Sequence, residues 1–295
     1  FGVAQRALLK QSGIDPHYLV MTATPIPRTM SMTLFGDLDT STLRAAPPGR
    51  QPVHTYFATE HQRDRWWEFF RKKLREGRQG YVVTPLVDES DDLQLASVQQ
   101  TFESLAHGEL ADFRLDFLHG RMSSSEKEFV MQNFRTGRTQ VLVATPVIEV
   151  GVDIANATLM TIEAGDRFGL AQLHQLRGRV SRGAHPGYVC VFGDPKTEEA
   201  HARLEAFTQS TDGFELAEID FRLRGPGDLF GKEQHGLPPL RIANLQQDAA
   251  ILEEARRDAQ ALFASDPQLA NPDFARLRKM AISRYGGALE LSDVG

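Results

Sequence analysis

The chain has 295 residues with a formal net charge of −6, and 41% of its residues are hydrophobic and 24% charged. This balance is typical of a soluble globular protein with one large domain or two smaller ones, and the acidic net charge excludes a protein that coats nucleic acid through bulk charge. Because the sequence has one cysteine, Cys190, no apolar run of about 18 residues and no histidine pair at metal-ligand spacing, we expect a cytoplasmic protein without a disulfide, a membrane span or a structural metal.

Short apolar runs alternate with helix-like segments from Tyr18 to about Phe192. The sequence begins with FGVAQRALLK, which is helix-like and has no initiator methionine, so we expect a piece of a longer polypeptide. The apolar runs predict strands at residues 18–24, 53–58, 80–86, 114–120, 140–145, 159–164 and 188–192. Strands that are apolar throughout and alternate with helices form parallel sheets covered on both faces, so the predicted fold class is α/β.

The helices are predicted from apolar periodicity and from capping residues. Residues 61–76 form a helix whose apolar stripe consists of Trp66, Phe69, Phe70 and Leu74. A second helix covers about 124–135, because Ser123 and Glu126 have the spacing of a capping box and Gly137 follows the end. Past the last strand, residues 196–221 and 246–264 are predicted helices, and the prolines and glycine of 45–52 indicate a domain break.

Polar residues follow several of the predicted strands, where a parallel sheet has its ligand crevice. One such threonine is most simply part of a turn, but four strand ends of this kind suggest a lined surface. These residues are Thr22, Ala23, Thr24 and Pro25 after the first strand, Thr84 and Pro85 after the third, His119 and Gly120 after the fourth, and Thr145 and Pro146 after the fifth.

The run PVIEVGVDI at residues 146–154 places Glu149, Gly151 and Asp153 among apolar residues. Gly151 permits close approach to the backbone, and Asp153 can accept a hydrogen bond from a sugar hydroxyl or fix a neighbouring arginine. The alternative is a tight loop with a capping aspartate.

The run QLRGRVSRG at residues 175–183 has three arginines in nine residues. As a helix it places Gln175, Arg179 and Arg182 on one side with Gly178 beside them, and Arg177 on a different face. One interpretation is a solvated basic face, and the other is a pair of guanidinium groups that bind phosphate.

Three of these stretches, in this order, resemble motifs III, V and VI of superfamily 2 helicases: TAT (22–24), ATPVIEVGVD (144–153) and QLRGRVSR (175–182). The run VMTATPIPRTMSMTLFGDLD (20–39) is similar in particular to the RecG family. DGFELAEIDFRLRGPGDLFGKEQHG (212–236) resembles the translocation motif that this family shares with the transcription-repair coupling factor. The resemblance implies an ATP-dependent DNA helicase that remodels stalled forks and Holliday junctions in recombination and repair.

The resemblance also implies three domains. Residues 1–46 would be the tail of a first RecA-like domain, 47–195 the second RecA-like helicase domain, and 196–295 a translocation hairpin followed by C-terminal helices. ATP and Mg²⁺ would be held mainly by the first RecA-like domain of the same polypeptide, and the partner would be branched or double-stranded DNA.

The family assigns a role to each matched position. Arg179 and Arg182 would reach the γ-phosphate of ATP with help from Gln175. Positions that touch or couple nucleotide would be Glu149, Gly151, Asp153 and Gly178, and Thr22, Ala23 and Thr24 would link hydrolysis to strand movement. The DNA backbone would face Thr84, Pro85, His119, Gly120 and Thr145, and the translocation motif would use Arg224, Gly225, Pro226, Gly227 and Gln234.

The sequence departs from the family at Ser181, Pro146 and Glu233, where glycine, threonine and arginine are usual. No phosphate-binding G-x-x-x-x-G-K-[ST] loop and no D-E-x-H box occur among the 295 residues. GPGDLFGKE (225–233) has the wrong glycine spacing for such a loop, and DESD (88–91) follows TAT when an acidic box should precede it. We therefore expect this chain alone neither to bind ATP tightly nor to hydrolyse it.

Three alternatives stay open from the sequence. The chain could be the motor of a transcription-repair coupling factor, which shares the translocation motif. It could be a non-catalytic α/β module that binds DNA or protein through residues 212–236. The third alternative, a small-molecule enzyme with an arginine-lined phosphate pocket, is weakened because we identify no candidate nucleophile or base near those arginines.

Overall fold

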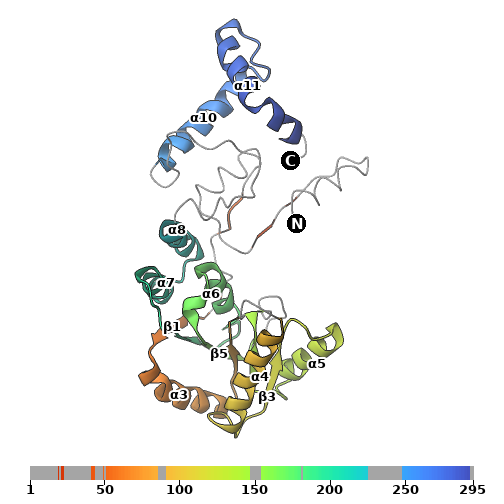
Figure 1. Ribbon diagram of the computed structural model, residues 1–295, viewed down its shortest axis with the longest axis vertical. Coiled ribbons are helices and arrows are strands. Elements are labelled where there is room, and N and C mark those ends of the chain that lie inside the picture. The colour runs from red at the N-terminus through yellow and green to blue at the C-terminus, as the bar shows by residue number, and fades with distance from the viewer. Residues whose placement is uncertain are drawn as a thin grey trace. The chain divides into compact units, whose positions relative to one another are not determined.

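The computed structural model describes residues 19, 21–22, 41–43, 49, 51–85, 91–146, 154–180, 182–224 and 248–292 (Figure 1). For residues 91–97, 224, 249 and 284–292 it describes the backbone alone. The chain divides into two compact units, Arg44–Leu223 and a second made of Phe1–Leu43 with Arg224–Gly295. Each unit is considered by itself.

The larger unit is built on a six-stranded sheet in which every strand pair is parallel, in the order β1-β6-β5-β2-β4-β3. The strands are β1 (Val53–Ala58), β2 (Gln79–Val83), β3 (Leu115–Leu118), β4 (Val141–Ala144), β5 (Ala157–Ile162) and β6 (Gly187–Phe192). They confirm six predicted strands and the α/β class; the predicted strand 18–24 lies largely outside the described residues.

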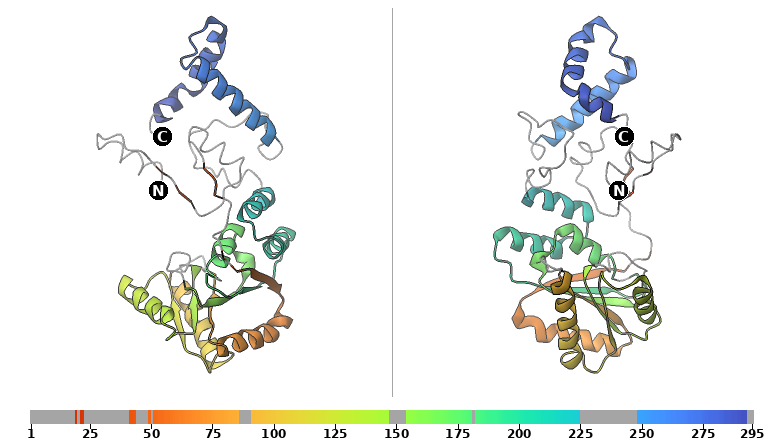
Figure 2. Two further views of the ribbon diagram at one scale, coloured as in Figure 1. Left: turned by 180° about the vertical axis from the view of Figure 1, so that it is seen from behind. Right: turned by 45° about the vertical axis from the view of Figure 1, so that its right-hand side comes forward.

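Helices cover both faces of the sheet, as Figure 1 and Figure 2 show. In chain order they are η1 (Glu60–Gln62), α3 (Arg63–Arg75), α4 (Asp91–His107), α5 (Ser124–Arg135), η3 (Gly165–Arg167), α6 (Leu170–Arg177), α7 (Glu198–Gln209) and α8 (Gly213–Arg224). Residues of α3 and α4 share one buried cluster with one face of the sheet, and residues of α5, α6, α7 and α8 share the other.

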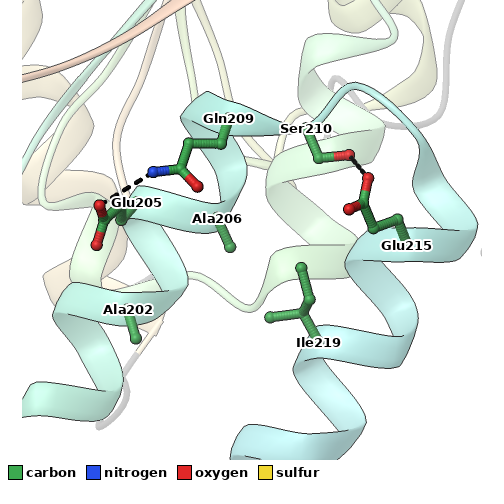
Figure 3. Close-up of a pocket in the computed structure, with 7 residues that line it drawn as sticks. All are labelled: Ala202, Glu205, Ala206, Gln209, Ser210, Glu215 and Ile219. Carbon is green, nitrogen blue, oxygen red and sulfur yellow. Dashed lines mark hydrogen bonds between the residues drawn. The ribbon is translucent and has the colours of Figure 1, made fainter.

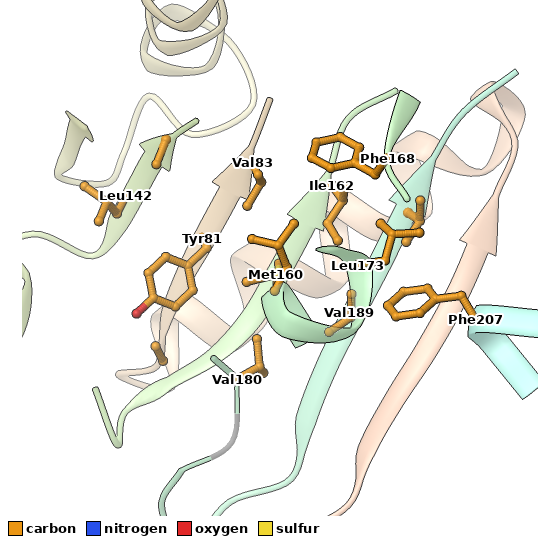
Figure 4. Packing of buried hydrophobic residues seen from close by; sticks show 14 of the residues in the cluster. Tyr81, Val83, Leu142, Met160, Ile162, Phe168, Leu173, Val180, Val189 and Phe207 are labelled. Carbon is orange, nitrogen blue, oxygen red and sulfur yellow. The ribbon is translucent and has the colours of Figure 1, made fainter. Parts of the chain in front are cut away.

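Alternation along the strands explains the two clusters. Tyr81 and Val83 of β2 belong to the cluster under α6, whereas Val82 between them belongs to the cluster under α3. Figure 4 shows Tyr81 and Met160 on neighbouring strands within the first cluster. Each fully buried large apolar side chain contributes about 1.5–3 kcal/mol to folding, so both faces of the sheet must be covered.

Two local predictions can be compared directly. The capping box of α5 is confirmed, because the Ser123 hydroxyl accepts from the Glu126 amide at 3.3 Å and the Glu126 carboxylate accepts from the Ser123 amide at 2.8 Å. The predicted stripe of α3 missed one residue. Trp67 is 1% exposed and belongs to the core, whereas the predicted member Phe69 is partly buried and packs against the core.

The segment predicted as one helix, 196–221, forms two helices. Helix α7 ends at Gln209 with Ser210 as its C-cap, and α8 begins after Asp212. The turn is held by the Ser210 hydroxyl, which accepts from the Asp212 amide, and by Asp212, which accepts from the Phe214 amide. Phe207 of α7 and Leu216 of α8 lie in the core cluster of the sheet. The compact unit thus continues to Leu223, whereas the sequence suggested a boundary at residue 195.

The described part of the smaller unit consists mainly of α10 (Ala249–Ser265), η4 (Pro272–Phe274) and α11 (Ala275–Ser292), and α10 confirms the helix predicted at 246–264. The Asp266 carboxylate ends α10 by accepting from the amides of Ala270 and Asn271, and these bonds lower its pKa. Within the described residues, no helix combines the length and the apolar character that a membrane crossing requires.

Candidate functional site

The predicted strand-end residues of β2, β3 and β4 meet at one edge of the sheet. The Thr84 amide donates to the carbonyl of Ala144 at 3.0 Å, and the Thr145 amide donates to the carbonyl of Leu118 at 3.2 Å. These bonds continue the ladder by one residue beyond β2 and β4. The structure therefore brings Thr84, Thr145 and His119 together, and we call this the strand-end group, with Pro85 and Gly120.

Burial divides the strand-end group. Thr84 and Thr145 are each 2% exposed, so their side chains offer almost no surface to a ligand, contrary to the expectation that they face DNA directly. The Thr84 hydroxyl has no hydrogen-bond partner within the described residues, which is costly for a buried polar group. His119 is partly buried and Gly120 is exposed.

His119 and Lys127 provide the accessible chemistry of this edge. The His119 ring stacks on Phe117 with centroids 5.8 Å apart, and burial, followed by the charge of Lys127, lowers its pKa. The Lys127 ammonium donates to the carbonyl of Gly120 at 2.5 Å. The charge of Glu126 acts on His119 in the opposite direction to that of Lys127, but its effect is smaller. An imidazole beside an ammonium can donate to an anionic oxygen.

The helical interpretation of residues 175–183 was correct only as far as Arg177. Gly178 is the C-cap of α6, and the amides of Arg179 and Val180 donate to the carbonyls three residues earlier, at 2.9 and 3.1 Å. This tighter winding ends the helix, because the buried Val180 side chain turns into the core. Arg179 and Arg182 therefore lie in the turn and loop beyond α6.

Arg179 and Arg182 still share one side of the molecule. Both guanidinium groups lie close enough to the Tyr81 hydroxyl to lower its pKa, although burial has the larger effect and raises that pKa to about 12. Arg179 and Gln175 are partly buried, and Arg182 is exposed with its Nε donating to the carbonyl of Gly178 at 2.9 Å. Two guanidinium groups whose charges both act on one side chain of the sheet suit a phosphate ligand.

Gly183 fixes the loop that follows the arginines. A Cβ at Gly183 would lie 2.6 Å from the carbonyl oxygen of Ala155, so only glycine allows this close approach to the start of β5. At Gly178 a Cβ would meet the carbonyl oxygen of Gln175 at 3.0 Å, which is also tight. The two glycines thus set the path of the chain that carries Arg179 and Arg182.

Arg177 is a structural residue that the sequence gave little reason to notice. It is 4% exposed, and its guanidinium donates to the carbonyl of Phe207 at 2.8 Å and lies 4.4 Å from the centroid of the Phe207 ring. Its second terminal nitrogen lies 3.2 Å from Nδ1 of His174. Arg177 therefore ties the end of α6 to the end of α7.

Several predicted site residues cannot be placed. Thr22 is exposed, and Arg224 is the last residue of α8, with its backbone alone described. The following lie outside the described residues: Ala23, Thr24, Glu149, Gly151, Asp153, Gly225, Pro226, Gly227 and Gln234. Of the positions that depart from the family, Pro146 is buried directly after β4, and Ser181 and Glu233 also lie outside the described residues.

A hollow of about 170 Å³ lies between α7 and α8, and neither Arg179 nor Arg182 lines it (Figure 3). The charged residues that line it are Glu205 and Glu215, and each carboxylate accepts a hydrogen bond. Glu205 accepts from Gln209 at 3.0 Å, and Glu215 accepts from Ser210 at 2.5 Å. Because carboxylates repel phosphate, the hollow does not suit the ligand that the arginines suit.

The arginines and the strand-end group occupy different places on the sheet. Tyr81 precedes Thr84 by three residues along β2, which is roughly 10 Å at the rise of a strand. In the described part of the chain, no three histidine, cysteine, aspartate or glutamate side chains gather as a metal site. The domain thus offers one place for a phosphate group and a separate edge for a second anionic ligand.

Two family models match the chain. The model described as the helicase conserved C-terminal domain matches residues 64–184, which include β2 to β5 of the sheet and the arginines. The model described as ATP-dependent DNA helicase RecG, domain 3, C-terminal, matches residues 210–283.

The ATP-dependent DNA helicase RecG of Synechocystis is 46% identical over 286 residues, which are 97% of this chain and 34% of that protein. The RecG of Bacillus subtilis is 45% identical over 278 residues, which are 94% of this chain and 41% of that protein. The solved structure of RecG bound to a three-way DNA junction is 43% identical, covers 80% of this chain and 30% of its own, and gives a TM-score of 0.61. The sheet is thus a RecA-like fold, and the chain spans about a third to two fifths of these relatives' length.

Proposed function

The chain belongs to the RecG family of DNA helicases, and we propose that it forms the second motor domain and translocation region of an ATP-dependent enzyme that remodels branched DNA. The observation that carries the proposal is that Arg179 and Arg182 follow a helix end that the buried Arg177 anchors, and that the charges of both act on Tyr81. The match to the RecG domain 3 model favours this function over the motor of a transcription-repair coupling factor.

In this proposal Arg179 and Arg182 act on ATP bound by another domain of the same polypeptide. That nucleotide, with Mg²⁺, supplies the phosphoryl group that is transferred to water. Bidentate guanidinium donors stabilise the charge that spreads over the phosphoryl oxygens, and such arginines contribute about 10³ to 10⁵ in rate. This chain's residues fit the donor part of such a site, while its sequence contains no phosphate-binding loop.

DNA would lie along the strand-end group. His119 and the backbone around Gly120 are its accessible members, and we propose that they contact phosphate oxygens together with Lys127 of α5, which is bonded to Gly120. Thr84 and Thr145 would act indirectly, because the Thr84 amide holds the end of β2 against β4 and the Thr145 amide holds the end of β4 against β3. Closure of the nucleotide site on Arg179 and Arg182 would then move the whole sheet unit against the DNA.

The test uses the full-length protein with Arg179→Gln or Arg182→Gln, and with Arg65→Gln as the control because Arg65 is an exposed arginine on α3. Each site variant should lose DNA-stimulated ATP hydrolysis by about 10³-fold or more, while junction binding and the unfolding temperature stay as in the unaltered protein. Retention of activity within about threefold in both variants would exclude the proposed role.

A second measurement uses the 295-residue chain alone. We expect no DNA-stimulated ATP hydrolysis, because the chain has arginine donors without a loop to cradle the phosphates. Turnover by the purified chain that survives removal of contaminating enzymes, and that is lost in Arg179→Gln, would show that the nucleotide site is complete here.

A further inference from the structure

The edge of the sheet opposite to the strand-end group carries a cluster of cations. Each lies in the last turn of a helix or in the connection that leads into a strand. We call this cluster the basic edge; its members are Lys72, Arg75, Arg78, Arg114 and Arg138. Lys72, Arg75, Arg114 and Arg138 are exposed, and Arg78 is partly buried.

Hydrogen bonds show that the basic edge is one continuous surface. The Gly80 amide donates to the carbonyl of Gln140 at 3.0 Å, and the Gln140 amide donates to the carbonyl of Arg114 at 2.8 Å. The Arg114 guanidinium in turn donates to the carbonyls of Arg138 and Gly137, at 2.5 and 3.2 Å. Because neighbouring strands lie about 4.8 Å apart, Arg78 before β2 and Arg114 before β3 are separated by roughly 10 Å.

Carboxylates at this edge do not balance the cations. Glu76 forms an ion pair with Lys73 at 2.7 Å, and Asp112 lies 4.0 Å from Arg75. The pKa of Glu76 is lowered, first by the hydrogen bond from Lys73 and also by the charges of Lys73, Lys72 and Arg78, which reports a positive potential.

The helix ends do not balance them either. Helices α3, α4 and α5 each end at this edge, and each C-terminus carries about half a negative charge. With Arg71, Lys73 and Arg135 the edge has eight cations against the carboxylates of Glu76, Glu109, Asp112 and Asp116, and Arg71 forms an ion pair with Glu109. An excess of about two to three positive charges therefore faces solvent, in a chain whose net charge is −6.

We propose that the basic edge is a second DNA contact, which holds the phosphate backbone of a duplex arm on the side of the sheet away from the strand-end group. The proposal rests on the proposed function, since a branched substrate has more than one duplex arm. A duplex presents one negative charge per about 1.7 Å of its axis, so cations spread over roughly 10 Å can face several phosphates.

An acidic protein partner fits this surface less well. Protein interfaces depend on buried aromatic and apolar anchors. None of the exposed large hydrophobic side chains in the described residues belongs to the last turns of α3 and α5, to the connection 108–114 or to residues 136–140. A surface of cations without apolar anchors suits a polyanion.

The test removes two cations whose side chains are exposed. Arg75 has a side chain 62% exposed, and Arg138 contributes its carbonyl, not its side chain, to the bond with Arg114. The double variant Arg75→Gln/Arg138→Gln is compared in the full-length protein with the control Arg65→Gln/Lys196→Gln, which removes the same charge elsewhere on the same unit. The measured quantity is the dissociation constant for a synthetic three-way DNA junction as a function of salt.

Each phosphate contact contributes about 0.9 to the slope of log K against log salt, so the basic-edge variant should have a slope shallower by about 2. The control variant should keep the slope of the unaltered protein. If the basic-edge variant and the control have equal slopes, the basic edge is not a DNA contact. This conclusion holds whether the basic edge has no ligand or binds an acidic protein. If the double variant unfolds, Arg138→Gln alone should reduce the slope by about 1.

Failure of this inference is distinct from failure of the proposed function. An unaltered full-length protein that neither binds the junction nor hydrolyses ATP would remove the proposed function itself. An active protein whose basic-edge variant binds with unchanged salt dependence removes the second contact alone.

Discussion

Replacing Arg177 separates the structural role of this arginine from the chemistry of its neighbours. Arg177→Met keeps an unbranched side chain but removes the guanidinium that donates to the carbonyl of Phe207 and lies over its ring. A buried carbonyl that loses its donor costs about 1–3 kcal/mol, and the lost contact with the aromatic ring costs about 0.5–2 kcal/mol. The expected loss of unfolding free energy is therefore about 2–4 kcal/mol.

The assay is chemical and thermal unfolding of the 295-residue chain, monitored on the larger unit by tryptophan fluorescence, since Trp66 and Trp67 both lie in its core. For a unit of this size, about 2–4 kcal/mol lowers the melting temperature on the order of 10 °C. Arg179→Gln and Arg182→Gln should unfold like the unaltered chain, because their side chains are partly buried and exposed.

The three arginines thus have opposite expected profiles in stability and in ATP hydrolysis. With hydrolysis measured in the full-length protein, Arg177→Met should lower the amount of folded protein while the folded fraction keeps its hydrolysis rate. Arg179→Gln and Arg182→Gln should lose the hydrolysis rate and keep the fold. If Arg177→Met unfolds within about 0.5 kcal/mol of the unaltered chain, or if Arg179→Gln is equally destabilised, the assignment of Arg177 to the fold is wrong.

Two further predictions concern local backbone conformation and pH. Ala164 adopts φ 47° and ψ 52°, where an alanine is strained by about 1–2 kcal/mol, so Ala164→Gly should raise the urea midpoint of unfolding. The matched change Gly165→Ala should lower stability by about 1–3 kcal/mol, because its Cβ would lie 2.0 Å from Cγ1 of Val191. A lower urea midpoint for Ala164→Gly contradicts this prediction. Ser123→Ala should cost about 1 kcal/mol at neutral pH. The hydrogen bond from Ser123 lowers the pKa of Glu126 below 4.5. The cap therefore stabilises the folded chain above that pH, and this stabilisation is lost as the pH falls through the folded pKa. A stability difference between Ser123→Ala and the unaltered chain that is constant from pH 7 to about pH 3 contradicts the assignment.

The sheet was predictable because its strands are apolar throughout. Residues 53–58 were predicted to the residue, and the capping box of Ser123 and Glu126 marked the start of α5. The split between α7 and α8 was not evident, because both halves have helix propensity and a serine and an aspartate end one helix and begin the next through side-chain bonds. Trp67 was missed for a related reason, since periodicity alone does not fix how far a helix rolls on a sheet.

The site was predictable as a set of residues and not as an arrangement. Family resemblance selected Arg179 and Arg182, but the helix that was expected to align them ends at Gly178, and their common side results from the turn and from Gly183. Arg177 carries the same side chain at a neighbouring position, and only the packing of Phe207 against it reveals its structural role. Burial of Thr84 and Thr145 likewise depends on the sheet register, which no local pattern encodes.

A net charge of −6 is compatible with DNA binding on two edges of one sheet because charges act over short distances in salt. At physiological ionic strength the Debye length is about 8 Å, so carboxylates elsewhere on the chain scarcely weaken the potential at the basic edge. The same screening prevents Lys127, at the strand-end group, and Arg138, at the basic edge, from acting as one patch. Contacts at the two edges should therefore add independently to the salt slope, and each can be removed without altering the other.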